Sequence, residues 1–99
     1  MRIGRIVRVE EHPRARKPSY KLWIEFGAEL GTKTSSAQLV HNYTPADLLN
    51  RLVICAVNLG TRNIAGFTSE VLTLGVPDAE GYVVLLAPAA DVPLGARVF

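Results

Sequence analysis

The sequence has a single cysteine, Cys55, among its 99 residues, which excludes an intrachain disulfide framework. This scarcity is typical of a reducing compartment, and the apolar neighbours of Cys55 indicate a buried structural thiol. The N-terminus lacks the apolar core of a signal peptide, and no apolar run approaches the roughly 20 residues that span a bilayer. We therefore expect a cytoplasmic protein without a membrane span.

Reactive groups are also scarce. The chain has two histidines and no Cys-x-x-Cys, His-Glu-x-x-His or glycine-rich phosphate loop. His12 lies in a turn before Pro13 and His41 precedes a predicted helix, so surface or capping roles are expected for both. Ser35 and Ser36 have no base partner placed by the sequence and are expected to end or bend a strand. We predict no enzyme, no catalytic residue, no metal site and no cofactor.

Neither positive nor negative charge is in large excess. Eleven basic and nine acidic residues give a formal net charge of +2, too little to predict nucleic-acid binding from bulk electrostatics. The hydrophobic fraction of 48% is close to that of ordinary globular chains, and the length suits one domain. We therefore expect a single domain over residues 1–99, whose function depends on where its charges lie.

Strand patterns dominate the chain, and turn residues separate them at short intervals. In the second strand Tyr20, Leu22, Ile24 and Phe26 alternate onto one face, which is predicted to be the core face. The fourth strand is almost wholly apolar, which predicts a central strand covered on both faces. The segment 59–66 is expected to be a loop. The six predicted strands cover residues 2–10, 20–26, 33–40, 51–58, 67–74 and 82–87.

A short helix is predicted between the third and fourth strands. Thr44 suits the N-cap, Pro45 the first helical position, and Asp47 lies three residues after the cap. Three strands, a helix and then more strands is the order of an OB barrel, in which the helix lies between the third and fourth strands. We therefore predict an all-β fold, a small OB barrel of five to six strands with one short helix. A small β-sandwich is the alternative.

The cations concentrate in one loop. Arg14, Arg16 and Lys17 follow the first strand, and in an OB barrel this loop and the one after the fourth strand flank the ligand-binding face. The second of these loops carries Asn58 and Arg62. Both segments then bring arginine and amide donors toward one cleft for an anionic or hydrogen-bonding ligand. The alternative is a solvated loop without a partner.

Two apolar features indicate contacts with another molecule. Trp23 lies on the polar face of the second strand, where it can stack on a base or on a partner's side chain; packing under a loop or against a second subunit is the alternative. The chain ends on Val98 and Phe99 without a polar tail, which favours a subunit contact there.

With these features the sequence resembles the tRNA-binding-domain OB proteins and, within them, the CsaA-type secretion chaperones. The most specific segment begins at Asn58-Leu59, continues through Arg62, and ends with the run 64–72. The other matching segments are 4–10, 15–23, 33–38, 43–45, 83–86 and 92–95. The resemblance covers nearly the whole chain and depends on the order and spacing of all of them.

The resemblance implies a non-enzymatic homodimer that binds unfolded polypeptides or preproteins and is linked to the Sec export machinery. Related domains, alone or attached to methionyl- and phenylalanyl-tRNA synthetases, bind tRNA through the same barrel. Peptide binding requires apolar pockets near Ser35, Ser36, Gln38 and Phe67. tRNA binding requires cations that reach phosphates, here Arg14, Arg16, Lys17 and Arg62.

Two departures from the family pattern bear on these expectations. CsaA-type chains usually carry a short N-terminal segment that helps to build the dimer, whereas this sequence starts at the first strand. Gly60-Thr61 stands where the family commonly has a proline pair before two basic residues, so this loop has one cation fewer. The leading hypothesis is a peptide-binding export chaperone. The alternatives are a binder of structured RNA and a structural subunit that docks onto a larger synthetase or export component.

Overall fold

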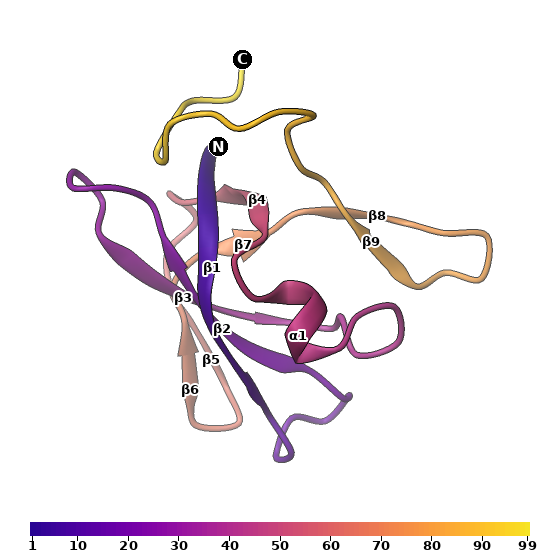
Figure 1. Ribbon diagram of the computed structural model, residues 1–99. Coiled ribbons are helices and arrows are strands. Elements are labelled where there is room, and N and C mark those ends of the chain that lie inside the picture. The colour runs from indigo at the N-terminus through magenta and orange to yellow at the C-terminus, as the bar shows by residue number, and fades with distance from the viewer.

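A five-stranded antiparallel sheet forms the body of the computed structural model, which describes residues 1–99 (Figure 1). Its strand order is β3-β2-β1-β4-β7, so the longest strand, β1, is the middle of the sheet. The strands are β1 (Arg2–Glu11), β2 (Tyr20–Glu25), β3 (Thr32–Ala37), β4 (Leu52–Ala56) and β7 (Leu72–Thr73).

The sheet curls until its two edges nearly meet. The backbone N–H groups of Glu70 and Val71, just before β7, donate to the Thr34 carbonyl of β3 at 2.8 and 3.1 Å. A register shift in the β1–β2 pairing between Ile6 and Arg8 bends β1, whose residues 2–5 pair with β4 and whose residues 5–11 pair with β2. The result is the expected all-β fold, a small OB-type barrel.

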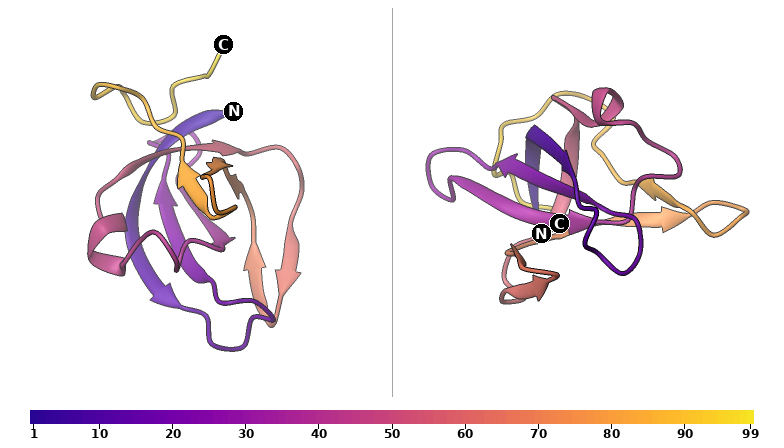
Figure 2. Two further views of the ribbon diagram at one scale, coloured as in Figure 1. Left: turned by 90° about the vertical axis from the view of Figure 1, so that its right-hand side faces the viewer. Right: turned by 90° about the horizontal axis from the view of Figure 1, so that it is seen from below.

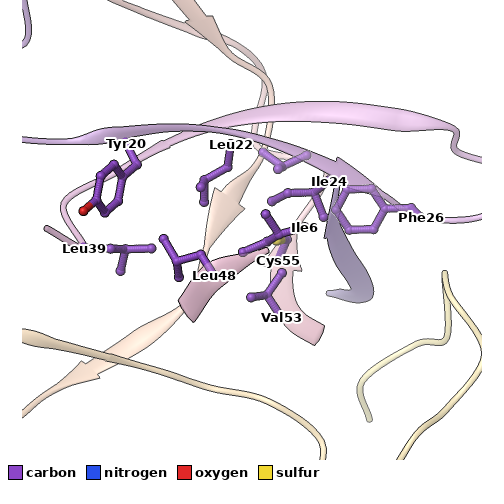
Figure 3. Close-up of a cluster of buried hydrophobic side chains, with 10 residues drawn as sticks. Ile6, Tyr20, Leu22, Ile24, Phe26, Leu39, Leu48, Val53 and Cys55 are labelled. Atoms are coloured by element: carbon purple, nitrogen blue, oxygen red, sulfur yellow. The ribbon is translucent and has the colours of Figure 1, made fainter. Parts of the chain in front are cut away.

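The barrel interior holds the side chains predicted to face the core (Figure 3). Tyr20, Leu22, Ile24 and Phe26 are all at most 5% exposed, which confirms the face assigned to β2. The side chains that complete this cluster come from β1, β4, the short helix and two connecting segments, and they are Ile6, Leu39, Leu48, Val53, Cys55 and Val71.

The helix lies between β3 and β4, as predicted. Helix α1 (Pro45–Leu48) begins after Thr44, whose hydroxyl accepts a hydrogen bond from the Asp47 N–H, while Asp47 accepts one from the Thr44 N–H. This reciprocal pair is a capping box, which stabilises the first turn. Leu48 is fully buried and anchors the helix in the barrel core.

The second half of the chain differs from the prediction. The expected loop 59–66 contains β5 (Arg62–Ile64), which forms a hairpin with β6 (Phe67–Ser69). The expected strand 67–74 is therefore wrong as a single element, because the chain turns at Glu70 to bond with β3 and resumes as β7. In β4 only Val53 and Cys55 are buried, so the outer face of this strand is partly open.

A second hairpin projects from the barrel (Figure 1). It pairs β8 (Gly75–Pro77) with β9 (Val83–Leu85), the latter lying within the predicted sixth strand. Both chain ends lie together at the opposite end from the tip of the β5–β6 hairpin, and the Val98 N–H donates to the Met1 carbonyl (Figure 2). The structure has no helix long and apolar enough to cross a membrane.

Candidate ligand-binding surface

The β1–β2 loop, residues 12–19, presents the predicted basic run on a braced backbone. The His12 N–H donates to the Ser19 carbonyl at 3.0 Å, and the Ser19 hydroxyl donates to the Lys17 carbonyl at 2.9 Å. These bonds close the base of the loop, while Arg16 and Lys17 stay exposed. The ion pairs of the structure involve Arg2 and Arg8, so the loop cations have no carboxylate partner.

The β5–β6 hairpin reaches toward this loop (Figure 2). Its two-residue turn consists of Ala65 and Gly66, both with positive φ, of 49° and 87°. Such a turn matches the twist of paired strands, and the left-handed conformation is strained for alanine. The Asn63 side-chain oxygen accepts a hydrogen bond from the Gly66 N–H at 3.0 Å, which holds the turn.

Side chains fasten the hairpin to β3. The buried Ser69 hydroxyl accepts a hydrogen bond from the Ser36 N–H at 3.0 Å and donates to the Val71 carbonyl at 3.2 Å. The Glu70 carboxylate accepts hydrogen bonds from both the Thr34 N–H and the Thr34 hydroxyl. These contacts satisfy part of the β3 edge and place the hairpin beside the basic loop.

Two adjoining grooves flank the basic loop and share Ala15, Arg16 and Ser19 as walls. The larger has a volume of about 490 Å³ and mixes apolar side chains with Glu11 and Arg16. The smaller has a volume of about 260 Å³ and lies between the loop, β3 and the hairpin. Its walls are Ala15, Arg16, Lys17, Ser19, Ser36, Gln38 and Ile64.

The structure brings together four of the predicted site residues and separates the others. Arg16, Lys17, Ser36 and Gln38 share the smaller groove. Ser35 is fully buried, where its hydroxyl accepts a hydrogen bond from Thr73, so it lines neither groove. The serine pair was also expected to end or bend a strand, and β3 ends at Ala37, one residue beyond the pair, where the chain bends.

Four more of the predicted site residues lie around three separate hollows. Arg14 and Phe67 line one of about 240 Å³ together with His12. Arg62 lines another of about 310 Å³ on a different part of the hairpin. Asn58 lies beside the chain termini, in a hollow of about 340 Å³ with Arg2 and Arg97. The expected single cleft for Arg16 and Asn58 therefore does not form.

Trp23 packs under the β5–β6 hairpin. Its ring meets the edge of Phe67 with 5.6 Å between centroids, and the Arg8 guanidinium lies 4.5 Å from its centroid. Lys21 lies 5.4 Å from the centre of the Phe67 ring. This arrangement agrees with packing under a loop, the alternative to ligand stacking, and it fixes where the hairpin rests on β2.

His12 is the residue that sequence reasoning missed. The expected surface position is wrong, because His12 is 3% exposed and its ring meets the edge of Phe67 at 5.8 Å. Its Nε2 lies 3.5 Å from the Ala65 carbonyl, and its Nδ1 has no hydrogen-bond partner. His12 thus joins the basic loop to the hairpin. Its neighbour Pro13 suggested only a turn, and the covering hairpin starts some 50 residues later in the chain. His41 is exposed and stacks on Tyr82, as its expected surface role requires.

The titratable groups of the chain do not form a reactive centre. Burial raises the pKa of the Cys55 thiol to about 11, since the thiolate would lose its solvation. Burial also raises the pKa of Tyr20, whose hydroxyl donates to the Tyr43 carbonyl at 2.8 Å. No three histidine, cysteine or acidic side chains gather in a way that could hold a metal ion. The grooves therefore offer hydrogen bonds, charge and apolar contact.

Comparison with known proteins places the chain in a family. Residues 1–97 match the family described as "Putative tRNA binding domain". Methionine–tRNA ligase from Pyrococcus furiosus is 40% identical over 98 residues, which is 99% of this chain and 13% of the ligase. The chain thus spans only a small part of the curated relatives that it matches.

Solved structures match over nearly their whole length. Chaperone CsaA from Bacillus anthracis is 46% identical, with a TM-score of 0.90, 99% of this chain and 88% of that chain covered. The CsaA chaperone protein from Picrophilus torridus is 44% identical, with a TM-score of 0.86 and 93% and 84% covered. The chain therefore belongs to the putative tRNA-binding-domain family and, within it, to the CsaA type.

Proposed function

We propose that the chain is a non-catalytic chaperone that holds exposed segments of unfolded polypeptides in the two grooves beside the basic loop. The observation that carries this proposal is the composition of the adjoining grooves. The larger offers Pro13, Pro18 and the 38% exposed Val40 to apolar side chains. The smaller offers hydroxyl and amide groups, from Ser36 and Gln38, to a main chain.

The relatives support the same proposal. Two proteins named CsaA chaperones match this chain at 44% and 46% identity, and the chain covers most of each. We infer that the clients of this chain are unfolded polypeptides and preproteins on their way to the Sec export machinery. The modest net charge of +2 suits a site that must accept many sequences.

An aggregation assay with a matched pair of variants tests this function. The protein should delay the aggregation of a chemically denatured client after dilution, and the Val40→Asp variant should lose this activity because a charge enters the apolar groove. Val7→Asp is the control, since Val7 is 44% exposed on β1 and lines neither groove. Aggregation that proceeds equally with and without the protein would exclude the chaperone function.

A second candidate function, tRNA binding, is favoured by the unpaired cations. Arg14, Arg16, Lys17 and Arg62 are exposed and have no carboxylate partner, and the family is named for tRNA binding. If these four side chains reach phosphates, replacing all four with alanine should reduce the salt dependence of tRNA binding by up to about four phosphate contacts. An unchanged slope in a titration from low to physiological salt would rule this function out.

We also propose a homodimer, formed through the projecting β8–β9 hairpin. Val76 and Val84 are paired neighbours, and both are at least 40% exposed, as is the adjacent Tyr82. A two-stranded hairpin is only marginally stable without cover, so a second copy stabilises it. The Val84→Glu variant should shift the solution mass from dimer to monomer in analytical ultracentrifugation. A monomeric parent protein would contradict the proposal.

A further inference from the structure

The outer edge of β3 is covered only as far as Ser36. Both backbone groups of Thr34 at this edge are paired. The Thr34 N–H donates to the Glu70 carboxylate, and the Thr34 carbonyl accepts from the Glu70 and Val71 N–H groups. At Ser36 the N–H donates to the Ser69 hydroxyl. Beyond Ser36 the β5–β6 hairpin no longer lies along β3, because it turns toward the basic loop.

The next backbone groups of this edge are open. In an antiparallel pair the N–H and C=O of one residue point to the same side, so the Ser36 carbonyl faces outward with its N–H. This carbonyl accepts no hydrogen bond, and Gln38 makes none with its backbone, since the chain bends there with the Leu39 N–H donating to the Ala37 carbonyl at 3.0 Å. One free acceptor and one free donor thus remain two residues apart.

The residues that carry these two groups, Ser36 and Gln38, line the smaller groove together with two unpaired cations. Arg16 and Lys17 line the same space of about 260 Å³ as Ser36 and Gln38, and neither has a carboxylate partner. A ligand that satisfies the groove must donate one hydrogen bond to the Ser36 carbonyl and carry an anion for the cations. A phosphodiester has the charge but no N–H or O–H of its own to donate to this carbonyl.

The end of a polypeptide carries both features within one residue, a backbone N–H and a terminal carboxylate. Resting on the proposed polypeptide-binding function, we propose that the smaller groove binds the C-terminal carboxylate of an extended polypeptide. The last backbone N–H of the ligand donates to the Ser36 carbonyl. Its carboxylate accepts hydrogen bonds from the Gln38 N–H and from Arg16, with Lys17 adding charge.

A pair of peptides that differ only at the C-terminus tests this assignment. A fluorescein-labelled unstructured peptide should bind in fluorescence polarisation at least about tenfold more tightly as the free acid than as the C-terminal amide, because charge-assisted hydrogen bonds are lost. N-methylation of its last residue should weaken binding as well, because it removes the donor to Ser36. N-methylation six residues earlier is the control.

Variants of the protein then locate the effect. The double variant Arg16→Gln/Lys17→Gln should abolish the difference between the acid and the amide. Arg97→Gln should preserve it, since Arg97 lies in the separate hollow at the chain termini. Equal binding of the acid and the amide by the parent protein would overturn this assignment and leave polypeptide binding intact. If neither peptide binds and a denatured client still aggregates, polypeptide binding itself fails.

Discussion

Removal of the Ser69 hydroxyl is the sharpest test of how the hairpin is held. Ser69 is 8% exposed, and its hydroxyl serves both the Ser36 N–H at 3.0 Å and the Val71 carbonyl at 3.2 Å. In Ser69→Ala both groups lose a partner inside the structure. A buried backbone group left unpaired costs about 1–3 kcal/mol; the Val71 carbonyl costs less because it keeps a second lone pair, and the Ser36 N–H costs less because it is only half-buried beside the groove. We expect unfolding to become easier by about 2 kcal/mol.

The single tryptophan provides the assay. Trp23 touches Phe67 of the hairpin, so its fluorescence reports both on global unfolding and on detachment of the hairpin. In urea, a domain of this size loses roughly 1–1.5 kcal/mol per molar denaturant, so the midpoint should fall by more than about 1 M. The emission of Trp23 should also change before the main transition, if the hairpin detaches first.

Ser36→Ala is the matched control, because the Ser36 hydroxyl makes no hydrogen bond while its backbone N–H is unchanged. Its free energy of unfolding should stay within about 0.5 kcal/mol of the parent value. If Ser69→Ala proves as stable as this control, the fastening role that we assign to the Ser69 hydroxyl is refuted.

Three further outcomes follow from the structure. Ala65→Gly should stabilise the chain by about 0.5 kcal/mol in urea unfolding, since glycine relieves the strain of φ 49°; a loss of stability would contradict it. The Cys55 thiol, with its pKa raised to about 11, should react with a disulfide reagent at pH 8 only when the protein unfolds. Hydrogen bonds from the Thr44 backbone, then from its hydroxyl, lower the pKa of Asp47 below 3.8, so its cap stabilises at neutral pH and weakens as pH falls through the lowered value. Asp47→Asn should therefore differ from the parent at pH 7, and the difference should shrink as the pH falls below 3.8.

Local patterns were sufficient for the first half of the chain. The alternation of Tyr20, Leu22, Ile24 and Phe26 identified the core face because side chains in a strand alternate with a period of two. The Thr44-Pro45-Asp47 cap identified the helix because its hydrogen bonds close within four residues. The OB order of strands and helix followed from these elements.

The second half of the chain could not be predicted in this way. Whether residues 67–74 form one strand or two depends on the bonds that Glu70 and Val71 make with Thr34, some 36 residues away in sequence. The burial of His12 could not be predicted for the same reason, because the hairpin that covers it begins 50 residues later in the chain. Separation of Asn58 from the basic loop likewise reflects barrel closure, which no local pattern encodes.

The sequence by itself determined the fold class, the core face of β2, the capped helix, the buried Cys55 and the family, since each depends on neighbours along the chain. Only the tertiary structure decided which polar residues share a groove. It placed Ser36 and Gln38 beside Arg16 and Lys17 and buried Ser35. The physical reason is that a backbone group becomes free or paired according to which distant strand lies against it, and the edge of β3 is covered from Thr34 to Ser36 but no further.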